Sequence, residues 1–258
     1  MKEWNGLLKK EWLTMKGQFL ATIVASILFI IMIPFGSNLL NFGLDTMQVS
    51  LIMSLIWMVI SMFIPAIILL ISLGKEMRHP DVWLHSKASI YKMFGSKAVF
   101  GLLVGVLNLA IPLVSIIIGS RFSNYPFELT FKMAIQVSGL LFVPFFLTSL
   151  LIMCTGLFFG VVYQLIKPKV FAVPIVILLF LGSSWVTERI SATDFYKGLT
   201  SFWAIKGPGK EIIDIAKDNT YIEIDTAILY GGDLLVGLLY AALLFIIAVT
   251  LFEKKVSV

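Results

Sequence analysis

The amino-acid sequence predicts an all-α membrane protein with six transmembrane helices, and three observations support this fold class. Of the 258 residues, 59% are hydrophobic and only 14% are charged, with a mean hydropathy of +0.98. A soluble domain has about 25% charged residues because water must solvate its surface. Long apolar runs recur along the chain, and Lys and Arg are unevenly divided between the connections. We therefore expect most of the surface to face lipid.

The apolar runs have the length of membrane-crossing helices. A helix needs about 20 residues to cross the hydrocarbon core, at a rise of about 1.5 Å per residue. The expected helices are residues 19–40, 49–73, 98–120, 136–163, 170–187 and 230–252. The fourth helix lies in a charge-free run, 133–166, that is too long for one straight crossing. We expect either a kink at Pro144 or a portion of the run at the membrane interface.

The distribution of Lys and Arg sets the expected orientation. Of the 20 cations, 13 fall in the N-terminal segment, in two alternate connections (75–97 and 167–169) and in the C-terminal segment, together with only five of the 15 acids. Cytoplasmic connections are enriched in Lys and Arg. Both termini are therefore expected in the cytoplasm. The same bias explains the net charge of +5 by topology, so no nucleic-acid partner is expected.

The first 18 residues predict an interfacial helix, the elbow helix. Trp4, Leu8, Trp12 and Met15 recur at helical spacing, and lysines occupy other faces. This pattern is typical of a helix that lies flat among the lipid headgroups before the chain turns into the first span. The alternative is a simple cytoplasmic extension of the first transmembrane helix.

Residues 75–97 form a polar segment between the second and third spans, with the sequence KEMRHPDVWLHSKASIYKMFGSK. Pro80 disfavours a helical conformation at His79, so a short amphipathic helix is expected to begin at or just after the proline. Such a helix could rest on the lipid headgroups or insert into a groove on a cytoplasmic partner. The residues alone leave both interpretations open.

Residues 188–226 form the second long polar segment, on the predicted outer side. Gly207, Pro208 and Gly209 give a turn signal, and residues 211–217 can form two helical turns. The segment is too short for a hydrophobic core of its own. We expect it to pack as a small extracellular cap over the outer ends of the helices, with substrate gating as the alternative.

The sequence contains no motif for catalysis or for a cofactor. No phosphate-binding loop and no H-E-x-x-H pattern occur, so the chain itself is not expected to be an enzyme or to hold a cofactor or metal. Asp233 is the one ionisable residue inside an expected span. An intramembrane carboxylate suggests a functional site, such as a gate. The alternative is an Asp near the outer headgroups.

Two pairs of small residues occur inside the spans. Gly101 with Gly105, and Gly156 with Gly160, have the spacing that lets two membrane helices approach closely. We expect these pairs to report helix packing rather than a ligand site.

The order of these elements resembles the permease subunits of ABC transporters of the type 2 exporter class. Those subunits have six helices, an elbow helix, a coupling helix between the second and third spans, and an extracellular element between the fifth and sixth. The matching residues are LLKKEWLTMKGQFL (7–20) and the segment 75–97, in which Glu76, Pro80 and Asp81 precede a helix, and Gly95 and Lys97 precede the third span.

The resemblance implies partners and a mechanism. The chain would pair with a second permease subunit, as a homodimer or heterodimer, and dock a cytoplasmic ATP-binding cassette subunit that binds ATP and magnesium. It would contact membrane lipid in a bacterial cytoplasmic membrane and export an apolar or amphipathic substrate, such as a peptide. The implied ATPase contacts are Glu76, His79, Asp81, Trp83 and His85. An ion-coupled secondary carrier, a membrane enzyme and an anchoring protein are the alternatives.

Overall fold

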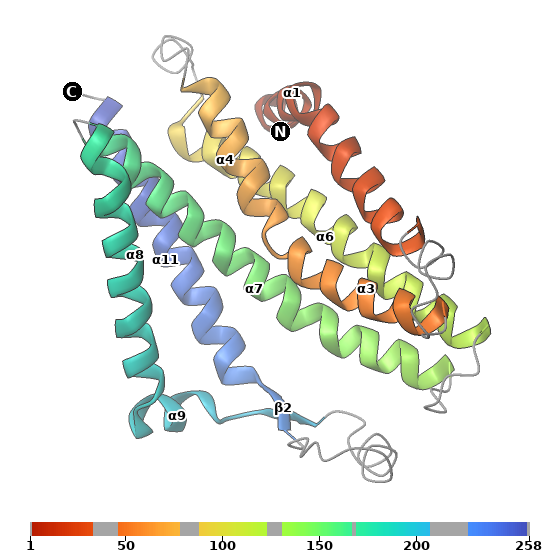
Figure 1. Cartoon of the computed structure of the whole chain (residues 1–258). Coiled ribbons are helices and arrows are strands. Elements are labelled where there is room, and N and C mark those ends of the chain that lie inside the picture. Colours follow the sequence, from red (N-terminus) through yellow and green to blue (C-terminus); the bar gives the residue numbers. More distant parts are fainter. Residues whose placement is uncertain are drawn as a thin grey trace.

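The computed structural model describes residues 2–32, 46–77, 88–122, 131–166, 169–206 and 227–256. These residues are almost entirely helical, with one small two-stranded sheet (Figure 1). The helices are α1 (Lys2–Ile27), η1 (Leu28–Met32), α3 (Thr46–Ser61), α4 (Ile64–Glu76), α6 (Ile90–Phe122), α7 (Phe131–Leu165), α8 (Lys169–Ser191), α9 (Asp194–Thr200) and α11 (Gly231–Val256). The strands are β1 (Ala204–Lys206) and β2 (Ala227–Tyr230).

Six helical stretches of the described residues are long and apolar enough to cross a membrane. They are Glu3–Met32, Ile52–Glu76, Ile90–Ile118, Ser138–Leu165, Val170–Ser191 and Gly231–Lys254. The prediction of an all-α membrane protein is thereby confirmed. Successive long helices run in opposite directions, so the start of α1 and the end of α11 lie at the same end of the bundle (Figure 1). We call this the terminal end, and the opposite end, which contains α9, the distal end.

The boundaries of the third and fourth spans differ from those expected. Helix α6 begins at Ile90, so the last residues of the segment 75–97 form its first two turns. Residues 78–87, where the start of the amphipathic helix was expected, lie outside the described residues. Helix α7 is continuous for 35 residues through Pro144, so the long apolar run forms one helix (Figure 1).

The second span is two helices, a feature that the sequence analysis missed. Helix α3 ends at Ser61 and α4 begins at Ile64, one residue before Pro65. Proline has no backbone N–H and fits the first turn of a helix better than its interior. A Cβ atom on Gly105 would overlap the Pro65 ring, so α6 lies this close to α4 only because position 105 lacks a side chain.

The second glycine pair also brings helices together. A Cβ on Gly160 would lie 2.7 Å from Cδ2 of Leu70, and one on Gly156 would contact Ala66. Helix α4 is therefore seated between the glycine-containing faces of α6 and α7. The expectation that both pairs serve helix packing is confirmed, because small residues give membrane helices close van der Waals contact, although Gly156 and Gly160 also line a cavity.

Packing is uneven across the bundle. The main buried cluster joins α4, α6, α7 and α11, and a second cluster joins α1, η1, α3, α4 and α6. Helix α8 stands at one side, beside α7 (Figure 1), and most of its apolar side chains are exposed. Such a surface suits contact with lipid.

At the distal end, β1 pairs antiparallel with β2, with Ala204 opposite Tyr230. This pairing joins the segment after α9 to the start of α11. Of the expected extracellular cap (188–226), the structure describes residues 188–206, and residues 207–226, which include the predicted turn and helical turns, lie outside the described residues.

Candidate functional site

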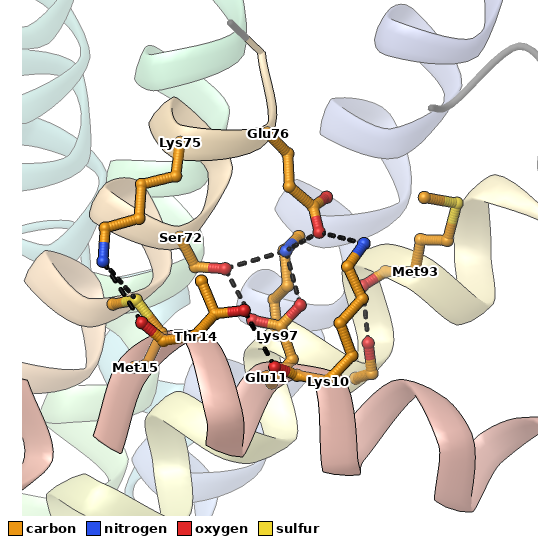
Figure 2. Close-up of polar contacts among 10 residues, drawn as sticks. Lys10, Glu11, Thr14, Met15, Ser72, Lys75, Glu76, Met93 and Lys97 are labelled. Carbon is orange, nitrogen blue, oxygen red and sulfur yellow. Dashed lines mark hydrogen bonds and ion pairs between the residues drawn. The ribbon is translucent and has the colours of Figure 1, made fainter. Parts of the chain in front are cut away.

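Five polar side chains from three helices meet inside the bundle near its terminal end (Figure 2). We call them the buried ion-pair network: Lys10 and Glu11 of α1, Ser72 and Glu76 of α4, and Lys97 of α6. The side chains of Lys97 and Glu11 are only 1% and 4% exposed, and their Nζ and Oε1 atoms are 2.6 Å apart. Burying such charges is costly unless each is paired and hydrogen-bonded.

Lys97 lies at the centre of the network and all three of its ammonium protons have acceptors. Its Nζ lies 2.6 Å from Glu11 Oε1, 3.0 Å from Glu76 Oε1 and 2.7 Å from Ser72 Oγ. An ammonium group has three donors and no acceptor, so the set is complete. Full pairing explains how a lysine can be buried here in its charged form.

The other members complete the hydrogen bonding. The Ser72 hydroxyl donates to Glu11 Oε2 at 2.6 Å, and Lys10 Nζ lies 2.6 Å from Glu76 Oε1. Two lysines and two glutamates make the network neutral as a whole. The second oxygen of Glu76, Oε2, is buried and has no hydrogen-bond partner among the described residues. The network thus has one spare acceptor next to the start of residues 78–87.

Further contacts join α1 to the same two helices. Lys75 Nζ donates to the Thr14 carbonyl at 3.2 Å, and Lys92 forms an exposed ion pair with Glu3 at 2.8 Å. The Trp4 ring packs on Gly95, where a Cβ would lie 3.1 Å from it. The N-terminal half of α1 is therefore fixed both to the end of α4 and to the start of α6.

The predicted elbow residues have different surroundings. Met15 is fully buried, and its sulfur lies 3.6 Å from Lys75 Nζ. Trp4 and Leu8 are half-buried, whereas Trp12 is 46% exposed and contacts the Phe19 and Phe100 rings. Helix α1 is uninterrupted from Lys2 to Ile27, so residues 2–18 and the start of the first span form one helix. Its position among the lipid headgroups stays a prediction.

Of the five predicted ATPase contacts, the structure describes only Glu76. Its carboxylate faces α1 and α6 in the network. The other four, His79, Asp81, Trp83 and His85, lie outside the described residues. The role of all five in docking therefore stays a prediction.

Sequence reasoning missed Glu11 and Ser72 and treated Lys97 only as the point where the chain re-enters the membrane. One signal was present. Leu7, Glu11 and Met15 follow one another at four-residue spacing, which places them on one face of a helix. A glutamate in the middle of an otherwise apolar face is a candidate for a buried pair. Its partner, 86 residues away, could not be identified without the tertiary structure.

Asp233 lies at the distal end, in the first turn of α11, and is exposed. The Tyr196 hydroxyl of α9 hydrogen-bonds to its carboxylate. Burial, the negative charge of Asp233 and this hydrogen bond all raise the pKa of Tyr196. A negative charge is favourable at a helix N-terminus. This placement fits the interpretation of Asp233 as a residue at the end of a span, and a gating role stays a prediction.

Comparisons of the chain with protein-family models, with curated proteins and with solved structures find no match. The structure shows six membrane-length helices and a buried ion-pair network that joins three of them. It assigns the chain to no family.

Proposed function

We propose that this chain is the membrane-spanning subunit of an ATP-driven exporter of the ABC type 2 exporter class. It would pair with a second permease subunit, identical or different, in a bacterial cytoplasmic membrane. Residues 75–97 would dock a separate cytoplasmic ATPase, which binds ATP and magnesium. The substrate would be apolar or amphipathic, such as a peptide.

The buried ion-pair network is the observation that most favours this proposal. Glu76, the last residue of α4, lies at the start of the proposed docking segment, and Lys97, two turns into α6, is its last residue. Both bind the same turn of α1, Glu76 through Lys10 and Lys97 through Glu11. A displacement of the segment by a partner would therefore move α1, α4 and α6 together. Coupling between distant sites needs such contiguous rigid contacts.

Co-purification tests the proposal directly. The full chain, tagged and extracted from its native host in mild detergent, is expected to retain a phosphate-loop ATPase that mass spectrometry identifies. Trp83→Ala is expected to reduce the amount of retained ATPase at least tenfold, since a large apolar side chain often anchors an interface. Trp185→Ala is the matched control, because Trp185 is an exposed tryptophan on α8, toward the distal end. Retention that is equal in both variants would contradict docking through residues 75–97.

The network also favours a second candidate, an ion-coupled carrier. Glu11 and Lys97 are buried ionisable groups on membrane-length helices, and such residues often belong to proton pathways. The two hydrogen bonds of Lys97 and its ion pair with Glu76 favour a structural role instead. A labelled amphipathic peptide in liposomes separates the two. Transport driven by a pH gradient without ATPase, and lost in Glu11→Gln, would establish the carrier and overturn the ATP-driven exporter.

A further inference from the structure

A cavity of about 790 Å³ lies between α4, α7 and α8, separate from the ion-pair network. Its volume falls in the range of about 300–1,000 Å³ that is typical of ligand sites. The lining is almost wholly apolar. Of the side chains around it, only Thr155, Tyr163 and Gln164 of α7 have polar groups.

The cavity is long and follows α7. Its α7 lining begins at Leu151 and ends at Gln164, and these residues recur on one face of the helix. Thirteen steps at about 1.5 Å each give a length of about 20 Å. The apolar core of one bilayer leaflet is about 15 Å thick, half of the total of about 30 Å. The cavity can therefore hold a hydrocarbon chain that spans one leaflet.

The two ends of the cavity differ in chemistry. Helices α4 and α7 run in the same direction and α8 runs in the opposite one (Figure 1). Gly74, Tyr163 and Gln164 therefore line the part nearest the terminal end, whereas Phe63 and Leu151 line the part toward the middle of the bundle. A hydroxyl and a carboxamide can both donate and accept hydrogen bonds. The cavity thus has two polar side chains at one end and a long remainder in which Thr155 is the one polar side chain.

Packing holds the walls in place. Gly156 and Gly160 place no side chain on the face of α7 that Leu70 of α4 approaches. Phe159 of α7 and Phe180 of α8 pair edge to face, with ring centroids 5.5 Å apart, and fix the opposite wall. An apolar cavity excludes water, and an unfilled one loses the dispersion contacts of its lining.

We propose that this cavity binds the acyl chain of a fatty-acid-like amphiphile. The polar head lies beside Tyr163 and Gln164, and the chain runs toward Phe63 and Leu151. Polarity at one end, a length of one leaflet and an apolar lining all match this ligand class. The proposal goes beyond ATP-driven export and does not depend on ATPase docking, because it concerns binding by this chain alone.

Two photoactivatable palmitate analogues test the site and its polarity. One has its diazirine near the carboxyl group and the other near the methyl end. The full chain is reconstituted in phosphatidylcholine nanodiscs and the adducts are mapped by mass spectrometry. The first probe is expected to label residues around Tyr163, and the second residues around Leu151 and Ile152. Excess unlabelled palmitate should remove most of both signals, because a site saturates whereas contact with bulk lipid does not.

Matched substitutions on α8 fill the cavity or leave it open. Val176→Trp adds bulk to the lining and is expected to reduce α7 adducts at least fivefold. Val186→Trp adds the same bulk to an exposed position of α8 outside the lining and should have no effect. Ile177→Trp gives a second lining variant if the first does not fold. Adducts around Leu239, 70% exposed on α11, serve as the reference for general contact with lipid.

Three results would overturn the proposal. The first is α7 labelling that does not fall with excess palmitate. The second is a ratio of α7 to Leu239 adducts that neither lining variant changes. The third is a reversed order of labelling by the two probes. None of these results depends on whether an ATPase co-purifies, so failure here is distinguishable from failure of the proposed function.

Discussion

The two ends of the bundle are held by different chemistry. At the terminal end, two lysines and two glutamates form ion pairs that join α1, α4 and α6, with the Lys97–Glu11 pair fully buried. At the distal end, the contacts are mainly backbone hydrogen bonds and close packing, with one side-chain hydrogen bond between Tyr196 and Asp233. Gly231 N donates to the Trp203 carbonyl at 3.0 Å, and Thr200 lies directly against Gly232. The first arrangement depends on charge balance and the second on shape.

The difference follows from the segments that each end must join. Helix α1 is far from α4 and α6 in sequence, and specific polar partners fix their relative positions. At the distal end, α9 is joined to α8 by a short turn, and the β1–β2 pairing brings the chain directly to α11. Trp203 even adopts a φ of 60°, a conformation uncommon for residues other than glycine. The distal end is therefore joined by contacts between elements that follow one another along the chain, from α9 to α11.

The largest effect is expected from breaking the charge balance with Lys97→Met. This change leaves Glu11 buried without its cation, and removing one partner of a buried pair typically costs about 3–5 kcal/mol. Thermal unfolding of the purified chain in detergent measures the loss. The control is Lys92→Met, because the ion pair of Lys92 with Glu3 is exposed and should add little stability. Equal losses in the two variants would contradict a stabilising role for the network.

A double variant sharpens this test. Glu11→Met combined with Lys97→Met removes one anion and one cation and leaves the Lys10–Glu76 pair in place. We expect it to be more stable than Lys97→Met alone, because apolar replacement of a whole buried pair is often tolerated. Losses that simply add would show that the two residues act independently.

The same contrast explains what the sequence could predict. Because the bilayer imposes a length and an apolar composition on every crossing, the six spans could be predicted from the charge-free runs. The charge distribution predicted that residues 75–97, with Glu76 and Lys97, form a polar connection. The structure instead places both side chains inside the bundle. The break before Pro65 was missed because the surrounding run is uniformly apolar. Pairings across 60 or more residues, such as Ser72 with Glu11, depend on tertiary packing that no local pattern reports.

An intermediate effect is expected from Gly232→Ala at the distal end. The new Cβ would overlap the Thr200 backbone, which cannot rotate away as a side chain can. Overpacking of this kind typically costs about 1–3 kcal/mol. Gly237→Ala is the matched control on the same helix, since its Cβ would lie at an ordinary 3.5 Å from Leu151. Thermal unfolding of both variants checks the prediction, which is wrong if Gly232→Ala is as stable as Gly237→Ala.

The smallest effect is expected from Tyr196→Phe, and it should depend on pH. The change removes one hydrogen bond to Asp233, so at neutral pH we expect only a small loss of stability. The raised pKa of Tyr196 means that the folded protein holds the phenol proton more tightly than the unfolded chain does. Above the ordinary tyrosine pKa of about 10, the unfolded chain releases this proton first. The free energy of unfolding therefore falls as pH rises from that value through the folded pKa.

The variant lacks the phenol and should lose less stability than the wild type over that alkaline range, so the two unfolding temperatures converge as pH rises. Gly237→Ala changes no ionisable group and retains Tyr196, so its difference from the wild type should contain no such tyrosine contribution. Unfolding temperatures at neutral pH and above pH 10 measure this convergence. A gap between Tyr196→Phe and wild type that stays constant would mean that Asp233 and Tyr196 do not interact through the ionisable phenol. The distal end would then depend on shape alone.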